Sequence, residues 1–279
     1  MLISCSVVCY QNAPEQIARV LNSLASCPHS DSPELWVTLV DNSPDDGLAA
    51  VARNFGVAYI HLPENPGFGA GHNVAIQSAI ERGAAYHLVL NPDTYFNSDV
   101  IPALTEFMQE HTDVGMIMPD IRYPDGSRQH LCKLLPTPLD LLMRRFAPGL
   151  YKSFGWIDRY ELRMSGYEKI MDVPALSGCF MFIRTSVLGE VGGFDERFFM
   201  YLEDVDLSRR IGRVARTVYF PLVSITHEYV KGSYKNRKLL FHHIRSAVLY
   251  FNKWGWFLDK ERSAVNQAAL EQFQSIHAW

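Results

Sequence analysis

The sequence lacks the features that mark several classes of protein. Its five cysteines are odd in number and include no Cys-x-x-Cys pair, so neither a disulfide framework nor a zinc site is indicated. No apolar run approaches the roughly 20 residues that a membrane span requires. The apolar segment 1–9 has no basic segment before it and is cut short by Gln11 and Asn12, which predicts a buried strand rather than a signal peptide. We therefore expect a cytoplasmic protein with reduced cysteines.

The charge is small overall but unevenly distributed. A net charge of −4 argues against a nucleic-acid partner. Residues 231–253, however, contain six Lys/Arg and no acidic residue, which favours an anionic partner there, such as phosphate or lipid headgroups. With 279 residues and 48% hydrophobic content, the chain is long and apolar enough to bury a large core.

The first 120 residues alternate two kinds of pattern. Apolar runs typical of fully buried strands alternate with segments of helical periodicity, and this alternation predicts βαβ units in a parallel sheet. Ligands of such sheets bind beyond the carboxyl ends of the strands. The predicted strands are 2–8, 35–40, 57–62, 86–90 and 115–118, and the predicted helices are 14–25, 47–55, 70–82 and 100–111.

The second half of the chain is less regular. Residues 123–126, Tyr-Pro-Asp-Gly, predict a hairpin tip, and residues 139–146 a short helix. Residues 144–166 show no regular pattern, which suggests a mobile stretch. A strand is expected at 173–183, and the chain is helical from about residue 237.

An aspartate ends the second predicted strand. Asp41 lies where a carboxylate can accept hydrogen bonds from a nucleobase or a ribose. Residues 41–47 are also dense in turn formers, so a purely turn-forming aspartate is an equal alternative on the residues alone.

The fourth predicted strand leads into Asn91-Pro92-Asp93. Two-residue spacing in an extended segment places Asn91 and Asp93 on one side, where both could face a metal-bound diphosphate. Hard divalent cations take oxygen ligands and neutralise a leaving diphosphate. By itself, however, an Asn-Pro-Asp is better explained as a turn.

A glycine-rich block at 64–73 follows the third strand and begins a helix. Backbone amides exposed by glycines at a helix start suit a phosphate or a sugar. Gly67 and Gly69 fit a dinucleotide fingerprint, but His72 stands where Gly or Ala is required for close packing. A dinucleotide site is therefore disfavoured.

An aromatic-rich stretch at 192–207 ends in three carboxylates, Glu203, Asp204 and Asp206. Acids in a first helical turn favour the helix dipole by about 0.3–1 kcal/mol each, and Asp206 with Arg210 makes an i,i+4 pair. Roughly 200° of helix rotation separates Asp204 from Asp206, so the two cannot share one task. One carboxylate could serve as a general base, although the residues alone favour capping at least as much.

His227 ends a further predicted strand, and Ser233 follows it in a basic loop. The imidazole could bind a metal ion or a phosphate. A lone histidine is more often a buried polar residue with a partner.

Taken in order, these segments resemble the inverting family 2 glycosyltransferases of the GT-A fold, in particular the bacterial rhamnosyltransferase-like branch. The resemblance extends from residue 1 to about residue 235. It implies an α/β fold with a Rossmann-like, mostly parallel sheet flanked by helices. Residues 1–120 would form the nucleotide-sugar-binding half, 121–235 the acceptor and catalytic half, and 236–279 a C-terminal helical segment. The matching segments are 7–12, 40–43, 65–73, 91–93, 177–179 and 192–207, with His227 and Ser233.

The resemblance also implies roles for individual residues. Asp204, with Glu203 beside it, would be the catalytic base, and direct displacement would invert the anomeric centre. Asp93 and His227 would hold Mn²⁺ or Mg²⁺ on the donor diphosphate. Asn91 replaces the first Asp of the usual Asp-x-Asp, so one ligand charge is missing. The implied contacts of the donor are Tyr10, Asn12, Asp41, Asn65, Gly69, Asn73, Asn91 and Ser233.

The implied substrates are a nucleotide-diphosphate sugar, with dTDP-L-rhamnose preferred, and a saccharide or polyprenyl-diphosphate-linked saccharide in cell-surface polysaccharide (O-antigen) synthesis. Two other functions stay open, a sugar-1-phosphate nucleotidyltransferase and a non-catalytic sugar-nucleotide-binding protein. A nucleotidyltransferase would need a cationic side chain for its triphosphate substrate just after the first strand, and residues 10–14 contain no such side chain. Intact Asp93, Asp204 and His227 argue against the second.

The segment 231–258 carries apolar residues at the spacing of one continuous helical face. With Tyr250, Trp254 and Trp256 suited to a headgroup layer, it predicts peripheral contact with the inner face of the plasma membrane. A helix packed on the catalytic domain explains the pattern equally well. The predicted face consists of Leu240, Ile244, Ala247, Val248, Phe251, Trp254 and Leu258.

Overall fold

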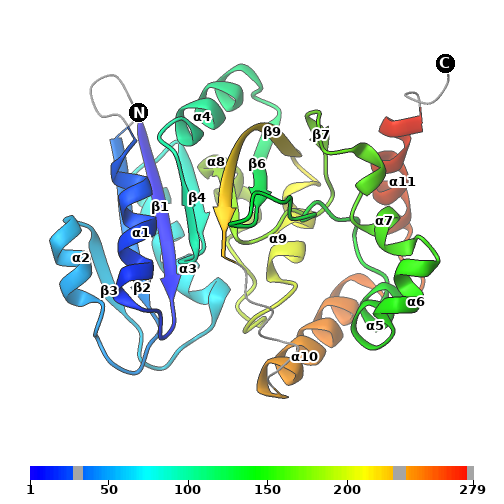
Figure 1. Ribbon diagram of the computed structural model, residues 1–279, viewed down its shortest axis with the longest axis horizontal. Helices are drawn as coiled ribbons and strands as arrows, with labels where there is room; N and C mark the ends of the chain where they lie inside the picture. Colours follow the sequence, from blue (N-terminus) through cyan, green and yellow to red (C-terminus); the bar gives the residue numbers. More distant parts are fainter. Residues whose placement is uncertain (28–33, 229–236, 275–279) are drawn as a thin grey trace.

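The computed structural model describes residues 1–27, 34–228 and 237–274, which form a mixed β-sheet with helices on both faces (Figure 1). The described strands are β1 (Leu2–Cys9), β2 (Glu34–Asp41), β3 (Ala58–His61), β4 (Tyr86–Leu90), β5 (Thr94–Phe96), β6 (Val114–Arg122), β7 (Met171–Asp172), β8 (Phe180–Arg184) and β9 (Arg216–His227). The described helices are α1 (Pro14–Ala25), α2 (Ala49–Phe55), α3 (Phe68–Glu81), α4 (Val100–Glu110), α5 (Pro138–Phe146), α6 (Pro148–Ser153), α7 (Trp156–Tyr160), α8 (Thr185–Val191), α9 (Glu203–Ile211), α10 (Arg237–Trp254) and α11 (Lys260–Gln274), with a 3₁₀ turn, η1 (Arg163–Ser165).

The N-terminal half is the predicted parallel unit. Strands β3, β2, β1 and β4 pair side by side and all run in the same direction. Pro14 begins α1, where a missing amide hydrogen costs nothing, and Gly56 ends α2 with a left-handed φ of 64°. Because the strands are parallel, the residues that follow β1, β2 and β4 meet at one edge of the sheet.

The second half of the sheet is mostly antiparallel. Strand β8 lies between β4 and β6 and runs antiparallel to both, while β9 pairs parallel with β6 and antiparallel with β5 and β7. Leu90 at the end of β4 faces Phe180 at the start of β8. The loop before β8 is thereby brought to the edge where the parallel strands end.

The predicted single strand over 173–183 is wrong. It consists of a loop followed by β8, because successive residues bond in different directions. The Val173 amide donates to the Thr217 carbonyl, Ala175 pairs with Lys133, and the Gly178 amide donates to Asp204. Pro174 between them has no amide hydrogen with which to continue a ladder.

The connection between the two halves is more ordered than its pattern indicates. The hairpin tip at 123–126 is confirmed by the Tyr123 amide, which donates to the Ser127 carbonyl at 2.8 Å. Residues 144–166, which show no regular pattern in sequence, form the end of α5, then α6, α7 and η1. Strand β5, which follows β4 after three residues, has no separate sequence signature.

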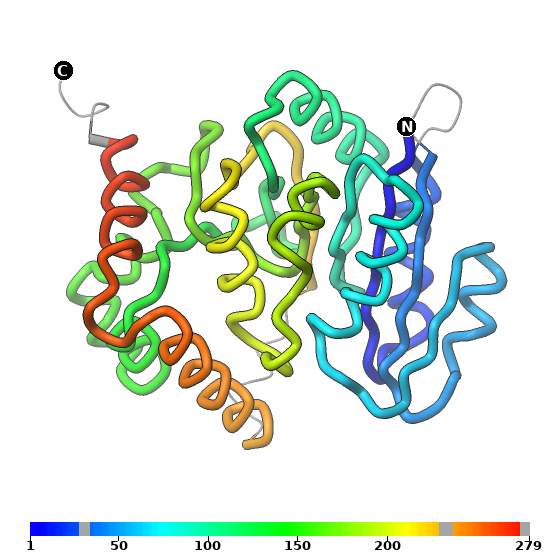
Figure 2. Tube along the Cα trace, turned by 180° about the vertical axis from the view of Figure 1, so that it is seen from behind, coloured from blue at the N-terminus to red at the C-terminus, as the bar shows by residue number. Residues whose placement is uncertain are grey.

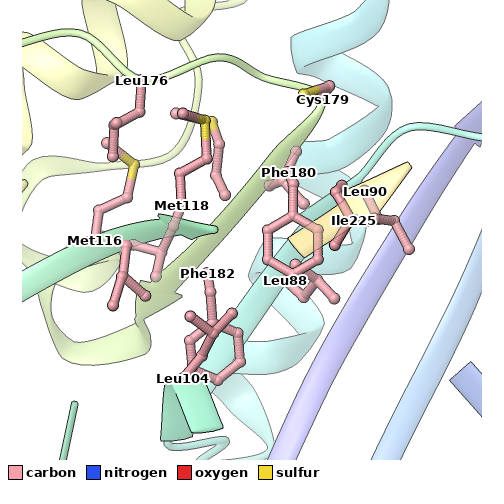
Figure 3. Packing of buried hydrophobic residues seen from close by; sticks show 14 of the residues in the cluster. Leu88, Leu90, Leu104, Met116, Met118, Leu176, Cys179, Phe180, Phe182 and Ile225 are labelled. Carbon is pink, nitrogen blue, oxygen red and sulfur yellow. The ribbon is translucent and has the colours of Figure 1, made fainter. Parts of the chain in front are cut away.

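The core lies on both faces of the central strands. Leu88 and Leu90 of β4 pack beside Phe180 and Phe182 of β8, and all four are fully buried (Figure 3). Helices α3, α8 and α9 cover one face, which Figure 2 presents, and α1 and α4 cover the other. Full burial on both faces explains why β4 is uniformly apolar apart from His87.

The C-terminal helices α10 and α11 are present as predicted. Tyr250 and Phe251 of α10 join a second apolar cluster with Phe198, Leu202 and Val205, so α10 is packed against the start of α9. None of the helices in the described ranges is long and apolar enough to cross a membrane. The division at residue 235 stays a prediction.

Candidate active site

Asp41 is a buried carboxylate at the end of β2 with two bonds already formed. Tyr59 donates its hydroxyl to Oδ2 at 2.9 Å, and the Ser43 amide donates to Oδ1 at 3.0 Å. Burial, and then the bond to Asp41, raises the pKa of Tyr59, so the hydroxyl stays a donor. The carboxylate is therefore held in one orientation, and each oxygen keeps a lone pair for a base or a ribose.

The loop after β1 lies beside Asp41 at the same edge. Asn12 accepts the Tyr10 amide at 2.9 Å and donates to Gln16 at 2.9 Å, which fixes the turn into α1. The Tyr10 side chain is 51% exposed and free of that turn. This placement suits a ring that stacks on a nucleobase.

The glycine-rich block is packed against the aromatic-acidic stretch. Gly67 has a φ of 105°, and a Cβ there would overlap the Phe199 carbonyl, which also accepts the Phe68 amide at 3.0 Å. A Cβ on Gly69 would lie 2.7 Å from the Cβ of Phe194. The first amide of α3 is thus already bonded to protein, and these glycines permit contact between two segments of the chain.

Asn73 and His72 continue this contact. Asn73 accepts the Phe194 amide at 2.7 Å and donates to the Phe194 carbonyl at 2.8 Å. His72 is fully buried and bonded to Ser6 at 2.6 Å, and burial followed by His87 holds its pKa well below the usual value. That Asn65, Gly69 and Asn73 bind the sugar-nucleotide donor stays a prediction. In the structure, Gly69 and Asn73 also pack against the segment that contains Phe194.

The three acids at the start of α9 face three different environments. Asp204 accepts the Gly178 amide at 3.1 Å and the Val205 amide at 2.8 Å. Glu203 is buried, and burial followed by the charge of Asp204 raises its pKa well above the usual value, which disfavours its charged form. Its Oε2 has no hydrogen-bond partner within the described ranges.

Asp206 is a structural carboxylate, as its pairing with Arg210 predicts. It is fully buried and bonds Arg210 at 2.9 Å, Trp254 Nε1 at 2.8 Å and Lys253 at 2.7 Å. These contacts tie α9 to α10. All of the charge of Asp206 is therefore used inside the fold.

The backbone just before α9 adopts an uncommon conformation. Tyr201 and Leu202 have φ values of 73° and 65°, in the left-handed region that costs on the order of 1 kcal/mol for such residues. Leu202 is buried against Phe198 and Tyr250, which holds the turn in place. Strain of this kind concentrates at functional sites, and here it presents Asp204 to the Gly178 loop.

The loop 177–179 joins the acidic turn to the end of β4. The Gly178 amide bonds Asp204, and the adjacent Cys179 carbonyl accepts the Asn91 amide at 2.9 Å. Two motifs that lie more than 100 residues apart in sequence therefore meet through two consecutive residues. This loop is what brings a candidate base next to a candidate metal ligand.

Asp93 and His227 face each other on paired strand ends. His227 Nε2 lies 3.3 Å from Asp93 Oδ1, and its Nδ1 lies 3.0 Å from Gln129 Oε1. Burial opposes the charged imidazole, but the Cys179 and Asp93 side chains outweigh it and raise the pKa of His227 to about 10.

The same pair fits a divalent cation that a substrate helps to hold. Asp93 Oδ1 is buried and, within the described ranges, finds no hydrogen-bond donor of normal geometry. Those ranges contain no group of three His, Cys, Asp or Glu side chains that could hold a metal ion alone. Mg²⁺-type sites often use one or two protein ligands and complete the shell with substrate phosphates and water.

Several partners in the site have no signature in the sequence. Gln129 orients His227 from a hairpin about 100 residues away, and Cys179 lies beside the same ring. Tyr59 could have been suspected, because a polar group in every second position of β3 marks one face of a strand. Ser233 lies outside the described residues.

Comparison with known proteins identifies a matching family, a relative of similar sequence and solved structures of similar fold. Residues 4–192 match the family Glycosyl transferase family 2. The N-acetylglucosaminyl-diphospho-decaprenol L-rhamnosyltransferase of Mycobacterium tuberculosis is 30% identical over 249 residues, 84% of this chain and 80% of the relative. S. aureus TarS 1–349 in complex with UDP shares the fold with a TM-score of 0.60 and 19% identity, over 99% of this chain and 72% of that one.

A second solved structure shares the fold and holds a metal. The mannosyltransferase PcManGT from Pyrobaculum calidifontis, in complex with GDP-Man and Mn²⁺, matches with a TM-score of 0.57 and 15% identity over 99% of this chain and 76% of that one. This chain spans 43% of a longer TarS chain.

Proposed function

Because the chain belongs to glycosyltransferase family 2 and has the GT-A fold, we propose that it transfers L-rhamnose from dTDP-L-rhamnose to a saccharide hydroxyl on a polyprenyl diphosphate. The activity of the M. tuberculosis relative, an N-acetylglucosaminyl-diphospho-decaprenol L-rhamnosyltransferase, supports the sugar and the class of acceptor. The chemistry rests on one observation, the loop 177–179 that bonds Asp204 on one side and the Asn91 segment on the other.

Asp204 is the group best placed to accept a proton. In the proposed reaction it removes the proton of the acceptor hydroxyl, whose oxygen then bonds the anomeric carbon from the face opposite the leaving group. The bond from that carbon to the diphosphate oxygen breaks, and the nucleoside diphosphate departs with the electron pair. We assign the base to Asp204 rather than Glu203, because burial and the neighbouring charge raise the pKa of Glu203 and disfavour its carboxylate form.

Asp93 and His227 would hold Mn²⁺ or Mg²⁺ together with the donor phosphates. When bound, the ion would neutralise charge that develops on the leaving diphosphate. Asn91 contributes a neutral side chain beside them, so this chain supplies one negative charge where Asp-x-Asp supplies two. Asp41 and Tyr10 are proposed to hold the donor base, at the ends of the neighbouring strands.

Product analysis tests the function against its alternatives. The chain is incubated with Mn²⁺, a panel of nucleotide sugars and N-acetylglucosamine on a short polyprenyl diphosphate. We expect the glycosylated acceptor and dTDP in equal amounts, with inverted anomeric configuration by NMR. Release of pyrophosphate would instead identify a nucleotidyltransferase, and binding without any product would identify a non-catalytic protein.

We also propose that the enzyme works on the cytoplasmic face of a membrane. Helices α5 and α10 lie beside each other in both views (Figures 1 and 2) and carry exposed apolar residues. We call these residues the α5–α10 surface, and its basic neighbours suit anionic lipids. The α5–α10 surface consists of Leu139, Leu142, Phe146, Phe241, Ile244 and Val248, and the basic residues on the same helices are Arg144, Arg145, Arg237, Lys238, Arg245 and Lys253.

The apolar face predicted for residues 240–258 is divided in the structure. Phe251 is buried, Tyr250 is fully buried, and Trp254 bonds Asp206 and lies under Arg209 at 4.2 Å. These side chains pack inward, as the alternative of a packed helix required. Ile244 and Val248 are exposed instead.

Flotation with vesicles tests the membrane proposal. We expect the chain to float with anionic vesicles at low salt and less at high salt, since each Lys or Arg near such a surface contributes about 1 kcal/mol. The double variant Phe146→Ser/Ile244→Ser should lose flotation, whereas Leu222→Ser, an equally exposed apolar residue on β9, should not. If the wild-type chain floats neither with anionic vesicles nor with neutral vesicles, the membrane proposal is overturned.

A further inference from the structure

Lys133 places a cation beside the catalytic loop. Its backbone pairs with Ala175 through two hydrogen bonds of 3.0 Å, and Ala175 lies three residues before the Gly178 amide that holds Asp204. The charge of Asp204 is among those that act on the Lys133 ammonium. Lys133 is therefore within electrostatic reach both of Asp204 and of Arg144 on α5.

The Lys133 ammonium has no ion-pair partner in the part of the chain that the structure describes. No carboxylate within residues 1–27, 34–228 and 237–274 forms an ion pair with it. Burial, and then the Arg144 guanidinium, lowers the pKa of Lys133, while Asp204 and Glu161 only partly offset this. A desolvated cation beside a second cation is costly unless an anion joins them.

Two further groups complete the cluster. Arg144 of α5 stacks over Tyr160 at 4.7 Å and reaches Glu161 at 3.5 Å, but Glu161 is bound more closely by Arg163 at 2.6 Å. His243 of α10 lies 4.9 Å from the Tyr201 ring, just before α9. Burial, and then Arg144, Arg145 and Lys133, lowers the pKa of His243, so these groups are within electrostatic reach of one another.

We propose that Lys133, Arg144 and His243 bind the diphosphate of the acceptor. This inference rests on the proposed function, which supplies an acceptor that carries a diphosphate. Lys133 is within electrostatic reach of Asp204, and Arg144 and His243 belong to α5 and α10, which carry the α5–α10 surface. One acceptor would therefore place its hydroxyl at Asp204, its diphosphate at the cluster and its lipid at the surface. A diphosphate matches two cations and an imidazole donor in charge and hydrogen bonding.

The donor also carries a diphosphate, and its expected place is different. Asp93 and His227 lie at the ends of β4 and β9, whereas Arg144 and His243 come from α5 and α10. The experiment must nonetheless separate the two sources, because the chemistry of both groups is the same.

The test compares two acceptors that differ only in the diphosphate. One is N-acetylglucosamine on a short polyprenyl diphosphate, and the other is the same sugar joined directly to the same polyprenol. In the full chain, Lys133→Gln and Arg144→Gln should each raise KM for the diphosphate acceptor 10- to 100-fold, about 1.4–2.7 kcal/mol. KM for the diphosphate-free acceptor and for the donor should not change.

Two control variants define the effect. Lys152→Gln removes an exposed cation of α6 outside the cluster and should leave both acceptors unaffected. Lys133→Arg keeps the charge and should restore most of the preference for the diphosphate acceptor. An equal rise in KM for both acceptors would reveal a structural role, and a rise in donor KM would assign the cluster to the donor. Either result overturns the inference.

The wild-type enzyme separates the inference from the function on which it rests. Transfer to both acceptors with equal KM would overturn the diphosphate subsite and leave the glycosyltransfer intact. Transfer to neither acceptor, with any donor of the panel, would overturn the proposed function and the subsite with it.

Discussion

Asp204→Asn should reduce transfer by about 10²–10⁴-fold and leave donor affinity unchanged, because a general base contributes a factor of that size. The side-chain oxygen of Asn can accept only one of the two backbone amides that hold Asp204, because Gly178 donates to Oδ2 and Val205 donates to Oδ1. The Tm of the variant therefore reports how much the turn before α9 depends on the lost hydrogen bond. The amide cannot accept the proton of the acceptor hydroxyl. The measurement is kcat for transfer, together with the donor Kd by calorimetry and the Tm of each variant.

Glu203→Gln is the matched control for this variant. Burial and the neighbouring Asp204 raise the pKa of Glu203, which favours the neutral carboxyl, and a glutamine matches that form in shape and charge. We expect kcat within a few-fold of wild type. Near-normal turnover in Asp204→Asn combined with a large loss in Glu203→Gln would move the base to Glu203.

The N-terminal half of the fold was predictable because its central strands, β1 and β4, are buried on both faces. Residues 86–90 are the clearest case: a short apolar run between a helix and a turn has no alternative to a central strand, and β4 has those bounds. Antiparallel β8 could not be located in the same way. Strand β8 begins just after Gly178, whose amide donates to Asp204. This contact joins residues that are 26 apart in sequence, so no local pattern encodes it.

The candidate site was predictable as a set of segments but not as a set of contacts. The end of each parallel strand pointed to Asp41 and Asp93, since the topology brings those ends together. The packing of Gly67 and Gly69 under Phe199 and Phe194 was not foreseen, because a glycine at a helix start suits a phosphate and a close backbone contact equally well.

Helical periodicity in α10 was correct, and its interpretation as one membrane face was wrong. A stripe of apolar residues gives the period of a helix but not the number of surfaces that it touches. Phe251 packs with Phe198 and Leu202, while Ile244 on the same helix is 51% exposed. The residues that cover one side of α10 lie about 50 residues earlier in the chain, and the stripe itself does not encode them.

Chelation with EDTA should abolish transfer, and Asp93→Ala should weaken donor affinity on the order of 10²-fold in Mn²⁺, about 2.7 kcal/mol. Asp93 offers a buried oxygen that has no hydrogen bond of normal geometry among the described residues, and the substitution removes the one carboxylate of the pair. Without Mn²⁺ the variant and the wild type should bind the donor equally. The measurement is the donor Kd by calorimetry, with and without metal.

Four affinities form a thermodynamic cycle: that of the donor with and without Mn²⁺, and that of Mn²⁺ with and without the donor. The coupling between metal and donor can therefore be measured by titrating either ligand. Mn²⁺ should tighten donor binding in the wild type, and the donor should tighten Mn²⁺ binding by the same factor, because the phosphates complete the coordination shell. Asp99→Ala, which removes an exposed acid six residues further along the chain, should keep the coupling at its wild-type value. Full activity in chelator, or equal coupling in Asp93→Ala and Asp99→Ala, would exclude a metal role for Asp93 and leave the diphosphate to be neutralised by the cations of the site.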